Sequence, residues 1–281
     1  MALLGLLNKS KNAAGEMSFW GHIDALRGHL FRSVIVVFII TAVLFFYSDF
    51  LFDVIIFGPL NSNFLTYRVF CKLSHLLNLG DQLCFGHYTF KLQSLGLADQ
   101  FTSLMWIAFL GGLIIGSPYL LWEIWRFIKP ALRDKEKKAS TGFIITSTFL
   151  FLTGVSFSYF VIVPLTINFL GTFQVSKMVE NNFTMDSYIS TLTTLTIATG
   201  IVFELPVFVY FLTKFGLVTP AFMRKYRKHA VVVILIAAAI ITPSPDVTSQ
   251  MLVAFPLYFL YEASIFVSRH VIKQKSKLET L

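Results

Sequence analysis

The chain has 281 residues, of which 56% are hydrophobic and only 14% are charged, and its formal net charge is +8. A water-soluble domain usually has about 25% charged residues because its surface must be solvated, so the composition excludes an ordinary soluble domain. A positive net charge also suits nucleic-acid binding, but no zinc-finger, helix-turn-helix or RNA-recognition pattern accompanies it, and no nucleic-acid partner is expected. The basic residues instead cluster between long apolar runs, as they do in proteins of the lipid bilayer.

Residues 1–29 are expected to form a cytoplasmic segment. The apolar run at the start of the chain is short, lacks preceding basic residues and has no small-residue cleavage site after it, so it does not read as a signal peptide. Further on, Phe19, Ile23, Leu26 and Leu30 recur at helical spacing and form one apolar stripe. This stripe predicts an interfacial helix on the membrane surface, and a simple juxtamembrane anchor explains it equally well.

Six uncharged stretches predict an all-α, polytopic membrane protein with six transmembrane helices. They cover approximately residues 30–47, 99–123, 143–164, 188–213, 230–241 and 251–267. The fifth stretch would form a helix of only about 18 Å at 1.5 Å per residue, which is less than the ~30 Å hydrocarbon core. Spans five and six are therefore expected to be short, and they either thin the bilayer or form a re-entrant hairpin.

The distribution of Lys and Arg among the connecting segments predicts the orientation. Besides the N-terminal segment, three segments are rich in basic residues: 126–140, 214–229 and 270–281. The segment 170–187 has a single lysine, Lys177, and the segment 51–98 is so long that the rule weakens there. Since basic loops stay in the cytoplasm, we expect both termini inside, with 51–98 and 170–187 as external loops of a bacterial inner-membrane protein.

Both cysteines of the chain, Cys71 and Cys84, fall within the first external loop. On the oxidising side of the membrane they are expected to form a disulfide that acts as a structural staple. Two free thiols in a membrane-associated loop are the alternative.

Motifs of enzymes are absent from the sequence. It contains no His-Glu-x-x-His, Gly-x-Ser-x-Gly, Walker A or Gly-x-Gly-x-x-Gly pattern, and its six histidines are scattered without the spacing of metal ligands. We therefore expect no catalytic residues, no metal and no cofactor.

Three acidic residues of the apolar stretches are singled out, and one of them, Glu262, lies near a span end where its side chain reaches the interface easily. Glu204 lies well inside the fourth stretch, in Phe203-Glu204-Leu205-Pro206, and an intramembrane carboxylate usually marks a functional site. Pro206 adds polarity there because it leaves a carbonyl of the preceding turn without its amide partner. An internal helix–helix hydrogen bond is the alternative for Glu204. Glu123 lies near a span end, where its side chain reaches the interface easily and a structural role is favoured.

The cytoplasmic segment 126–140 contains two acids, Asp134 and Glu136, among six bases. Such acids usually form weak local ion pairs at an exposed surface. A carboxylate in this place also suits an incoming guanidinium, which it binds in a two-pronged geometry that an ammonium group does not reproduce.

Six motifs in order resemble the TatC family, the multispanning subunit of the Sec-independent twin-arginine protein translocase. The resemblance extends from about Phe19 to about Arg269. The motifs are His22–Arg27, Gly58–Leu60, Phe127–Glu136, Tyr159–Leu165, Phe203–Pro206 and Thr242–Gln250. Four prolines within them are expected to have structural roles: Pro59, Pro130, Pro164 and Pro206.

The resemblance implies a receptor that binds Arg-Arg signal peptides of folded proteins at the cytoplasmic face, for export driven by the proton-motive force. The residues implied in peptide binding are Phe127, Glu136, Arg27 and Asp24. The residues predicted to make intramembrane polar or partner contacts are Glu204, Gln250, Asp246 and Glu123. The resemblance implies that Glu204 faces the TatA- and TatB-like single-span subunits or the inserted signal peptide, and that Gln250 bonds to a partner helix. The protein is expected to assemble with further copies of itself within the translocase.

One motif departs from the family. The family usually reads His-Leu-x-Glu-Leu-Arg, whereas here Ala25 occupies the place of the acid and Asp24 lies one residue earlier. On a helix this shift rotates the carboxylate by about 100°. Glu136 is therefore expected to carry more of the recognition.

Two other functions remain open at this point. The first is a proton-coupled secondary transporter of a small solute, with Glu204 in the proton path. Such transporters usually contain internal repeats, and residues 1–140 and 141–281 show none. The second is a membrane scaffold without cargo of its own, which the sequence does not exclude.

Overall fold

The computed structural model describes residues 19–76, 78, 80, 84, 86, 92–128, 140–174, 176, 181–242 and 247–279. Within it, only the backbone is described for residues 19–25, 128, 140, 141, 143, 248 and 275–279. The described chain is helical apart from loops and two strands of two residues each. Lipid offers no hydrogen-bond partner to the backbone, so apolar runs satisfy their amides and carbonyls within helices. The prediction of an all-α membrane protein is confirmed.

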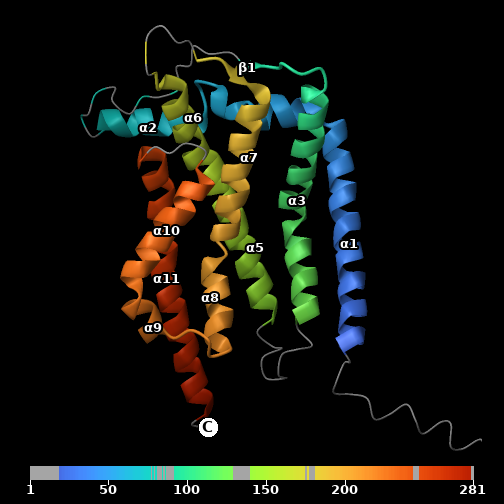
Figure 1. Cartoon of the computed structure of the whole chain (residues 1–281), viewed down its shortest axis with the longest axis vertical. Helices are drawn as coiled ribbons and strands as arrows, with labels where there is room; N and C mark the ends of the chain where they lie inside the picture. The colour runs from blue at the N-terminus through green and yellow to red at the C-terminus, as the bar shows by residue number, and fades with distance from the viewer. Residues whose placement is uncertain are drawn as a thin grey trace, which may run out of the picture.

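Helices α1 (Phe19–Phe46) and α3 (Asp99–Ile128) pack side by side (Figure 1). A Cβ atom on Gly112 would lie 2.4 Å from Thr41 Oγ1 and 3.1 Å from the Val37 carbonyl oxygen, so glycine is what permits this close approach.

Helix α1 differs from the sequence prediction at its start. Residues 19–29 were expected to lie on the membrane surface as a separate helix, but they continue without a break into the first span. No proline interrupts the segment, and Gly28 alone does not stop a helix that lipid and α3 support.

The chain between α1 and α3 forms a cap at one end of the bundle, drawn at the top of Figure 1. It contains a π-helical turn η1 (Phe50–Ile56), a 3₁₀ turn η2 (Gly58–Leu60), helix α2 (Leu65–Leu76) and strand β1 (Leu92–Gln93). Three tyrosine hydroxyls donate to carbonyls of this cap: Tyr159 to Ile55 (2.6 Å), Tyr188 to Ile56 (2.6 Å) and Tyr67 to Pro59 (2.7 Å). These bonds satisfy backbone carbonyls at the ends of the short helical turns, which have no amide partner within the turn.

The third span is one rod of three parts: α5 (Ser140–Phe157), the π-helical turn η4 (Ser158–Ile162) and α6 (Val163–Thr172). Pro164 follows the turn and is buried, in keeping with its predicted structural role. A proline has no amide hydrogen and its ring collides with the carbonyl four residues earlier, so the local widening accommodates it. Strand β2 (Phe183–Thr184) then pairs in parallel with β1.

The fourth span is broken in the middle. Helix α7 (Met185–Val202) ends just before Phe203, and α8 (Leu205–Lys214) begins with Pro206 in its first turn. Glu204 is the residue at the break and caps α8 with its backbone. Proline is favoured in the first turn of a helix because its missing amide has no partner there, so the break follows from the sequence.

The last part of the chain forms α9 (Pro220–Lys225), α10 (Arg227–Ile241) and α11 (Val247–Glu279). Five helical stretches of the described chain are long and apolar enough to cross a bilayer, and α10, with 15 residues, is not among them. The expectation of a short fifth element agrees with α10. The expectation of a short sixth span is corrected, because α11 has 33 residues. The sequence criterion stopped at Arg269, but Arg and Lys extend a helix readily and bring their charges to the interface.

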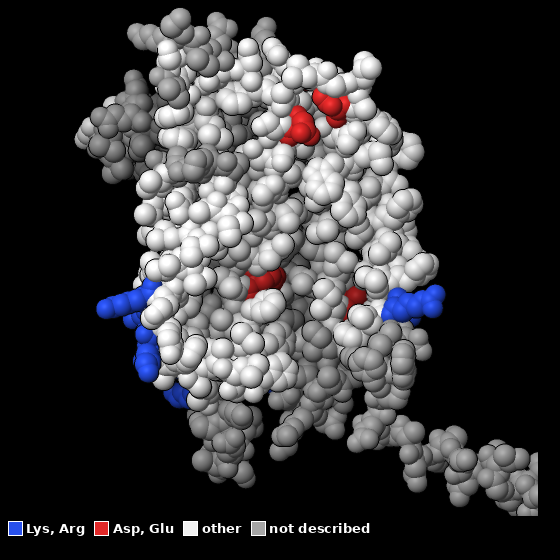
Figure 2. Space-filling model, in the orientation of Figure 1, with Lys and Arg blue, Asp and Glu red and all other residues white. Residues whose placement is uncertain are grey.

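Helix α1 begins and α11 ends at the same end of the bundle (Figure 1). On the face drawn in Figure 2, the described Lys and Arg side chains lie toward that end. Several stack on aromatic rings, among them Arg126 on Trp122 (5.4 Å) and Lys214 on Tyr210 (5.7 Å). Such pairs are typical of the interface on the cytoplasmic side. By the positive-inside rule, we assign the cap with the tyrosine bonds to the external end.

Candidate functional site

The cytoplasmic ends of α1 and α3 are joined by a buried carboxylate. Glu123 is 1% exposed, and its Oε2 lies 2.5 Å from His29 Nδ1 on α1. Its Oε1 accepts a hydrogen bond of 2.8 Å from the hydroxyl of Tyr119, one turn earlier on α3. Both oxygens of Glu123 are thus used within the chain, in keeping with the structural role that the sequence favours for this residue.

Phe127 lies one turn beyond Glu123 and is half-buried. Its ring meets the imidazole of His29 edge to face, with the ring centroids 6.2 Å apart and an interplanar angle of 66°. Arg27 is exposed on α1, two residues before His29. The two helices thus bring the end of the N-terminal segment to the start of the loop that the sequence singled out.

Three residues predicted for this site, Glu136, Pro130 and Asp24, have no described side chain. Glu136 and Pro130 fall in the segment 129–139, outside the described residues. The backbone at Asp24 belongs to α1, and its side chain is not described. Of the predicted peptide-binding residues, only Phe127 and Arg27 have described side chains. Phe127 contacts His29, which lies two residues after Arg27 on α1.

Glu204 is held at the break between α7 and α8 by a neighbouring helix. Its Oε2 accepts a hydrogen bond of 2.7 Å from Ser147 on α5. Its Oε1 is buried and has no hydrogen-bond partner within the described chain. The internal helix–helix hydrogen bond considered from the sequence is therefore present. The second carboxylate oxygen is buried without a donor among the described residues, and burying a polar atom in this way costs free energy. The adjacent Pro206 is buried at the start of α8.

The polar residues of α10 and α11 also contact each other. Gln250 donates from Nε2 to the Leu235 carbonyl (2.9 Å), so this donor is used inside the chain. Arg227 Nη2 and Glu262 Oε2 form an ion pair of 2.7 Å between α10 and α11, and both side chains are partly exposed. Asp246 lies outside the described residues.

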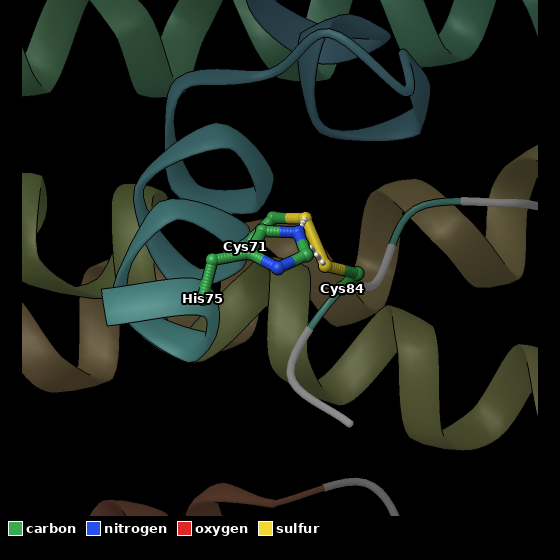
Figure 3. A group of neighbouring side chains, drawn as sticks. All are labelled: Cys71, His75 and Cys84. Atoms are coloured by element: carbon green, nitrogen blue, oxygen red, sulfur yellow. Dashed lines mark hydrogen bonds between the residues drawn. A yellow bond between two sulfur atoms is a disulfide. The ribbon is translucent and has the colours of Figure 1, made fainter. Parts of the chain in front are cut away.

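The cysteines of the external cap are joined in a disulfide, Cys71–Cys84. Figure 3 shows His75 beside it, with Nε2 3.7 Å from Cys71 Sγ and 4.0 Å from Cys84 Sγ. The three ligand atoms lie close enough together for a metal ion. However, a cysteine binds a metal as its thiolate, and the disulfide engages both sulfurs. The arrangement is a staple between the end of α2 and the following segment.

Three residues of these networks were not singled out from the sequence: His29, Tyr119 and Ser147. Tyr119 and Glu123 are four residues apart, and this spacing on a helix indicates that they are neighbours. His29 and Ser147 come from other helices, and one sequence contains no signal for such pairing.

Comparisons of the sequence with known proteins identify the family. The profile of the family described as "Sec-independent protein translocase protein (TatC)" matches residues 21–256. The chain is 42% identical to the TatC of Blattabacterium sp. subsp. Periplaneta americana over 266 residues, which cover 94% of this chain and 100% of that protein. It is 38% identical to the TatCy of Bacillus subtilis over 186 residues, or 66% of this chain and 73% of that protein.

Solved structures show the same architecture. A crystal structure described as "Twin Arginine Translocase Receptor- TatC" superposes with a TM-score of 0.67 at 31% identity, covering 89% of this chain and 99% of that one. A second structure of that receptor, in DDM, gives a TM-score of 0.69 at 32% identity, covering 88% and 99%. The chain is therefore a multi-pass membrane protein that belongs to the TatC family of Sec-independent protein translocase components.

Proposed function

We propose that this chain is the receptor of the translocase, which binds Arg-Arg signal peptides of folded proteins at its cytoplasmic end and assembles with single-span partner subunits. The observation that carries the proposal is the contact of His29 with Phe127. In this contact the N-terminal part of α1 lies beside the end of α3, and the basic segment that contains Glu136 follows α3 in the sequence. The names of the similar solved structures, which describe a twin-arginine translocase receptor, support the same function.

Recognition by this site would rest on guanidinium chemistry. Two adjacent arginines need acceptors at fixed places, and a carboxylate binds a guanidinium through two parallel hydrogen bonds. Lysine offers a compact charge without this geometry, so a Lys-Lys peptide should bind more weakly. The aromatic ring of Phe127 adds an apolar surface on which the segment after the arginines would pack.

Glu204 is the candidate contact for a single-span partner. Its Oε1 is buried without a donor, so a side-chain amide or hydroxyl from an inserted helix would satisfy it. The transporter hypothesis uses the same carboxylate. Uptake of a small solute into proteoliposomes that is lost in Glu204→Gln would favour the transporter.

The proposal is tested by photocrosslinking in membrane vesicles. A photoreactive residue at position 127, 136 or 204 should crosslink to a twin-arginine precursor or a partner subunit. The crosslinks at 127 and 136 should disappear with a Lys-Lys precursor. Equal crosslinking of the two precursors would refute the receptor function.

A pair of variants separates the receptor from a scaffold. Glu136→Gln should abolish export of a twin-arginine substrate, whereas Asp134→Asn, in the same basic segment, should leave export largely intact. A scaffold without cargo would export equally well in both variants.

A further inference from the structure

The contact between α1 and α3 is mainly apolar and offers little to fix how the two helices are aligned. In the middle of the membrane it rests on Gly112 and Gly116 of α3 against Val37, Ile40 and Thr41 of α1. Small residues let the two helices approach closely, and these glycine contacts lie in the middle of the membrane, away from the cytoplasmic end. A directional polar contact would fix the alignment at that end.

The His29–Glu123 pair has the properties of such a feature. It is the place where a side chain of α1 bonds to a carboxylate of α3, and that carboxylate is 1% exposed. Ser33 donates to the His29 carbonyl (2.9 Å) within α1, and Tyr119 holds the second oxygen of Glu123 on α3. A buried polar pair adds little net stability compared with apolar packing, but it penalises every alignment in which the partners separate.

The pair also lies next to the proposed binding site. His29 contacts Phe127 through its ring, and α3 ends at Ile128, directly before the segment that contains Glu136. Arg27 lies on the same helix as His29, half a turn toward the cytoplasm. A shift of α1 against α3 would therefore change the distance between the two sides of this site.

We propose that His29 and Glu123 are positioning residues of the receptor: their bond fixes the cytoplasmic start of α1 against the end of α3 and so sets the spacing of the signal-peptide site. The inference rests on the proposed function, and it assigns Glu123 an internal role in place of a partner contact. Glu123 is buried and the side chain of His29 is 17% exposed, so we infer that the pair acts through Phe127 and the adjacent segments, without touching the peptide.

Among the described residues, the other charged groups that act on the pair come from the same two helices. Arg126 on α3 and Arg32 on α1 act electrostatically on this cluster together with Tyr119. The guanidinium of Arg126 stacks over the ring of Trp122 at 5.4 Å. Arginine is therefore available near Glu123, and the test must show that His29 is the required partner.

The first experiment is a double-mutant cycle on the full chain in lipid nanodiscs. A fluorescent Arg-Arg signal peptide is titrated against the native protein, His29→Ala, Glu123→Ala and the double variant. Each single variant should weaken binding about tenfold, and the double variant should be no weaker than the worse single variant, since both remove one contact. Independent losses that multiply to about a hundredfold would overturn the proposal.

Two further variants sharpen the cycle. His29→Gln keeps a hydrogen-bond donor and should restore binding to within about threefold of the native protein. An equal loss in His29→Gln and His29→Ala would overturn a hydrogen-bonded role. Glu262→Gln removes the ion pair between α10 and α11, Arg227–Glu262, and should leave peptide binding unchanged.

The second experiment needs no peptide. Spin labels are attached to cysteines introduced at Gly28, where a side chain meets open space, and at Ile124, which is 54% exposed. The native cysteines are joined in a disulfide and do not take up label. The distance distribution between the labels should be narrow in the native chain and in Glu262→Gln, and broad in His29→Ala.

This second result distinguishes the two proposals. An unchanged distribution in His29→Ala would overturn the positioning role whatever the peptide does. A native chain that binds no Arg-Arg peptide, but whose distribution broadens in His29→Ala, would refute the receptor function and support the positioning of α1 by Glu123.

Discussion

The two ends of the bundle are held together by different chemistry. At the external end, tyrosine hydroxyls donate to main-chain carbonyls, and a disulfide closes the segment after α2. In the cytoplasmic half, side chains of different helices bond to each other, as in His29–Glu123, Ser147–Glu204 and Arg227–Glu262. These three external hydrogen bonds join neutral donors and acceptors, whereas each of these three cytoplasmic contacts contains a carboxylate.

The two kinds of contact differ in how easily they are exchanged. A main-chain carbonyl is present whatever the sequence, so the external cap is fixed by the course of the backbone. A bond between two side chains depends on both residues, and another donor with better geometry is able to replace one partner. Under the proposed receptor function, we therefore expect bonds between helices to change in the cytoplasmic half when cargo or a partner binds.

The largest effect on stability is expected from breaking the buried cytoplasmic pair. His29→Leu leaves the carboxylate of Glu123 buried with Tyr119 as its remaining partner, which should cost about 4 kcal/mol of unfolding free energy. The double variant His29→Leu, Glu123→Leu should recover most of this loss, since an apolar pair often replaces a buried polar pair at little cost. Unfolding in mixed micelles measures both. A double variant as unstable as the single one would contradict the explanation.

The external disulfide should rank next. Replacing Cys71 and Cys84 by alanine opens a loop with a sequence separation of 13, and the entropy gained by the unfolded chain should lower stability by about 3 kcal/mol. Peptide binding should keep its native affinity, because the site lies at the opposite end. A loss of affinity in this folded variant would show that the two ends are not independent.

The sequence predicted the helical membrane fold, because composition and apolar run length are visible in local stretches, and it placed Glu204 inside the fourth span. It did not predict the helix break at Glu204, although Pro206 explains the break once it is seen. It did not predict the continuation of α1 from Phe19 or the length of α11, since packing and lipid extend a helix beyond its uncharged core. It identified Glu123 and Glu204 as unusual but not their partners. His29 and Ser147 are 94 and 57 residues away from them, and such pairing depends on how the helices fold together.

A smaller effect is expected from a single tyrosine of the external cap. Tyr188→Phe keeps the ring, which is 7% exposed, but removes the donor to the Ile56 carbonyl. A buried acceptor without its donor should cost about 2 kcal/mol in unfolding free energy. Tyr47→Phe is the matched control because Tyr47 is 65% exposed, and it should change stability by less than about 0.5 kcal/mol.

The smallest effect should come from the Arg227–Glu262 pair, and it tests whether burial decides what a cytoplasmic contact contributes. The side chains of Arg227 and Glu262 are 46% and 23% exposed, against 17% and 1% for His29 and Glu123. Solvated charges gain little from pairing, so Glu262→Gln should lower the unfolding free energy by only about 0.5 kcal/mol. The loss should shrink further at high salt, which screens exposed charges, whereas the loss in His29→Leu should not. If Glu262→Gln proved as damaging as His29→Leu, burial would not be what separates the two pairs. The special place of His29 at the binding site would then rest on the peptide-binding cycle alone.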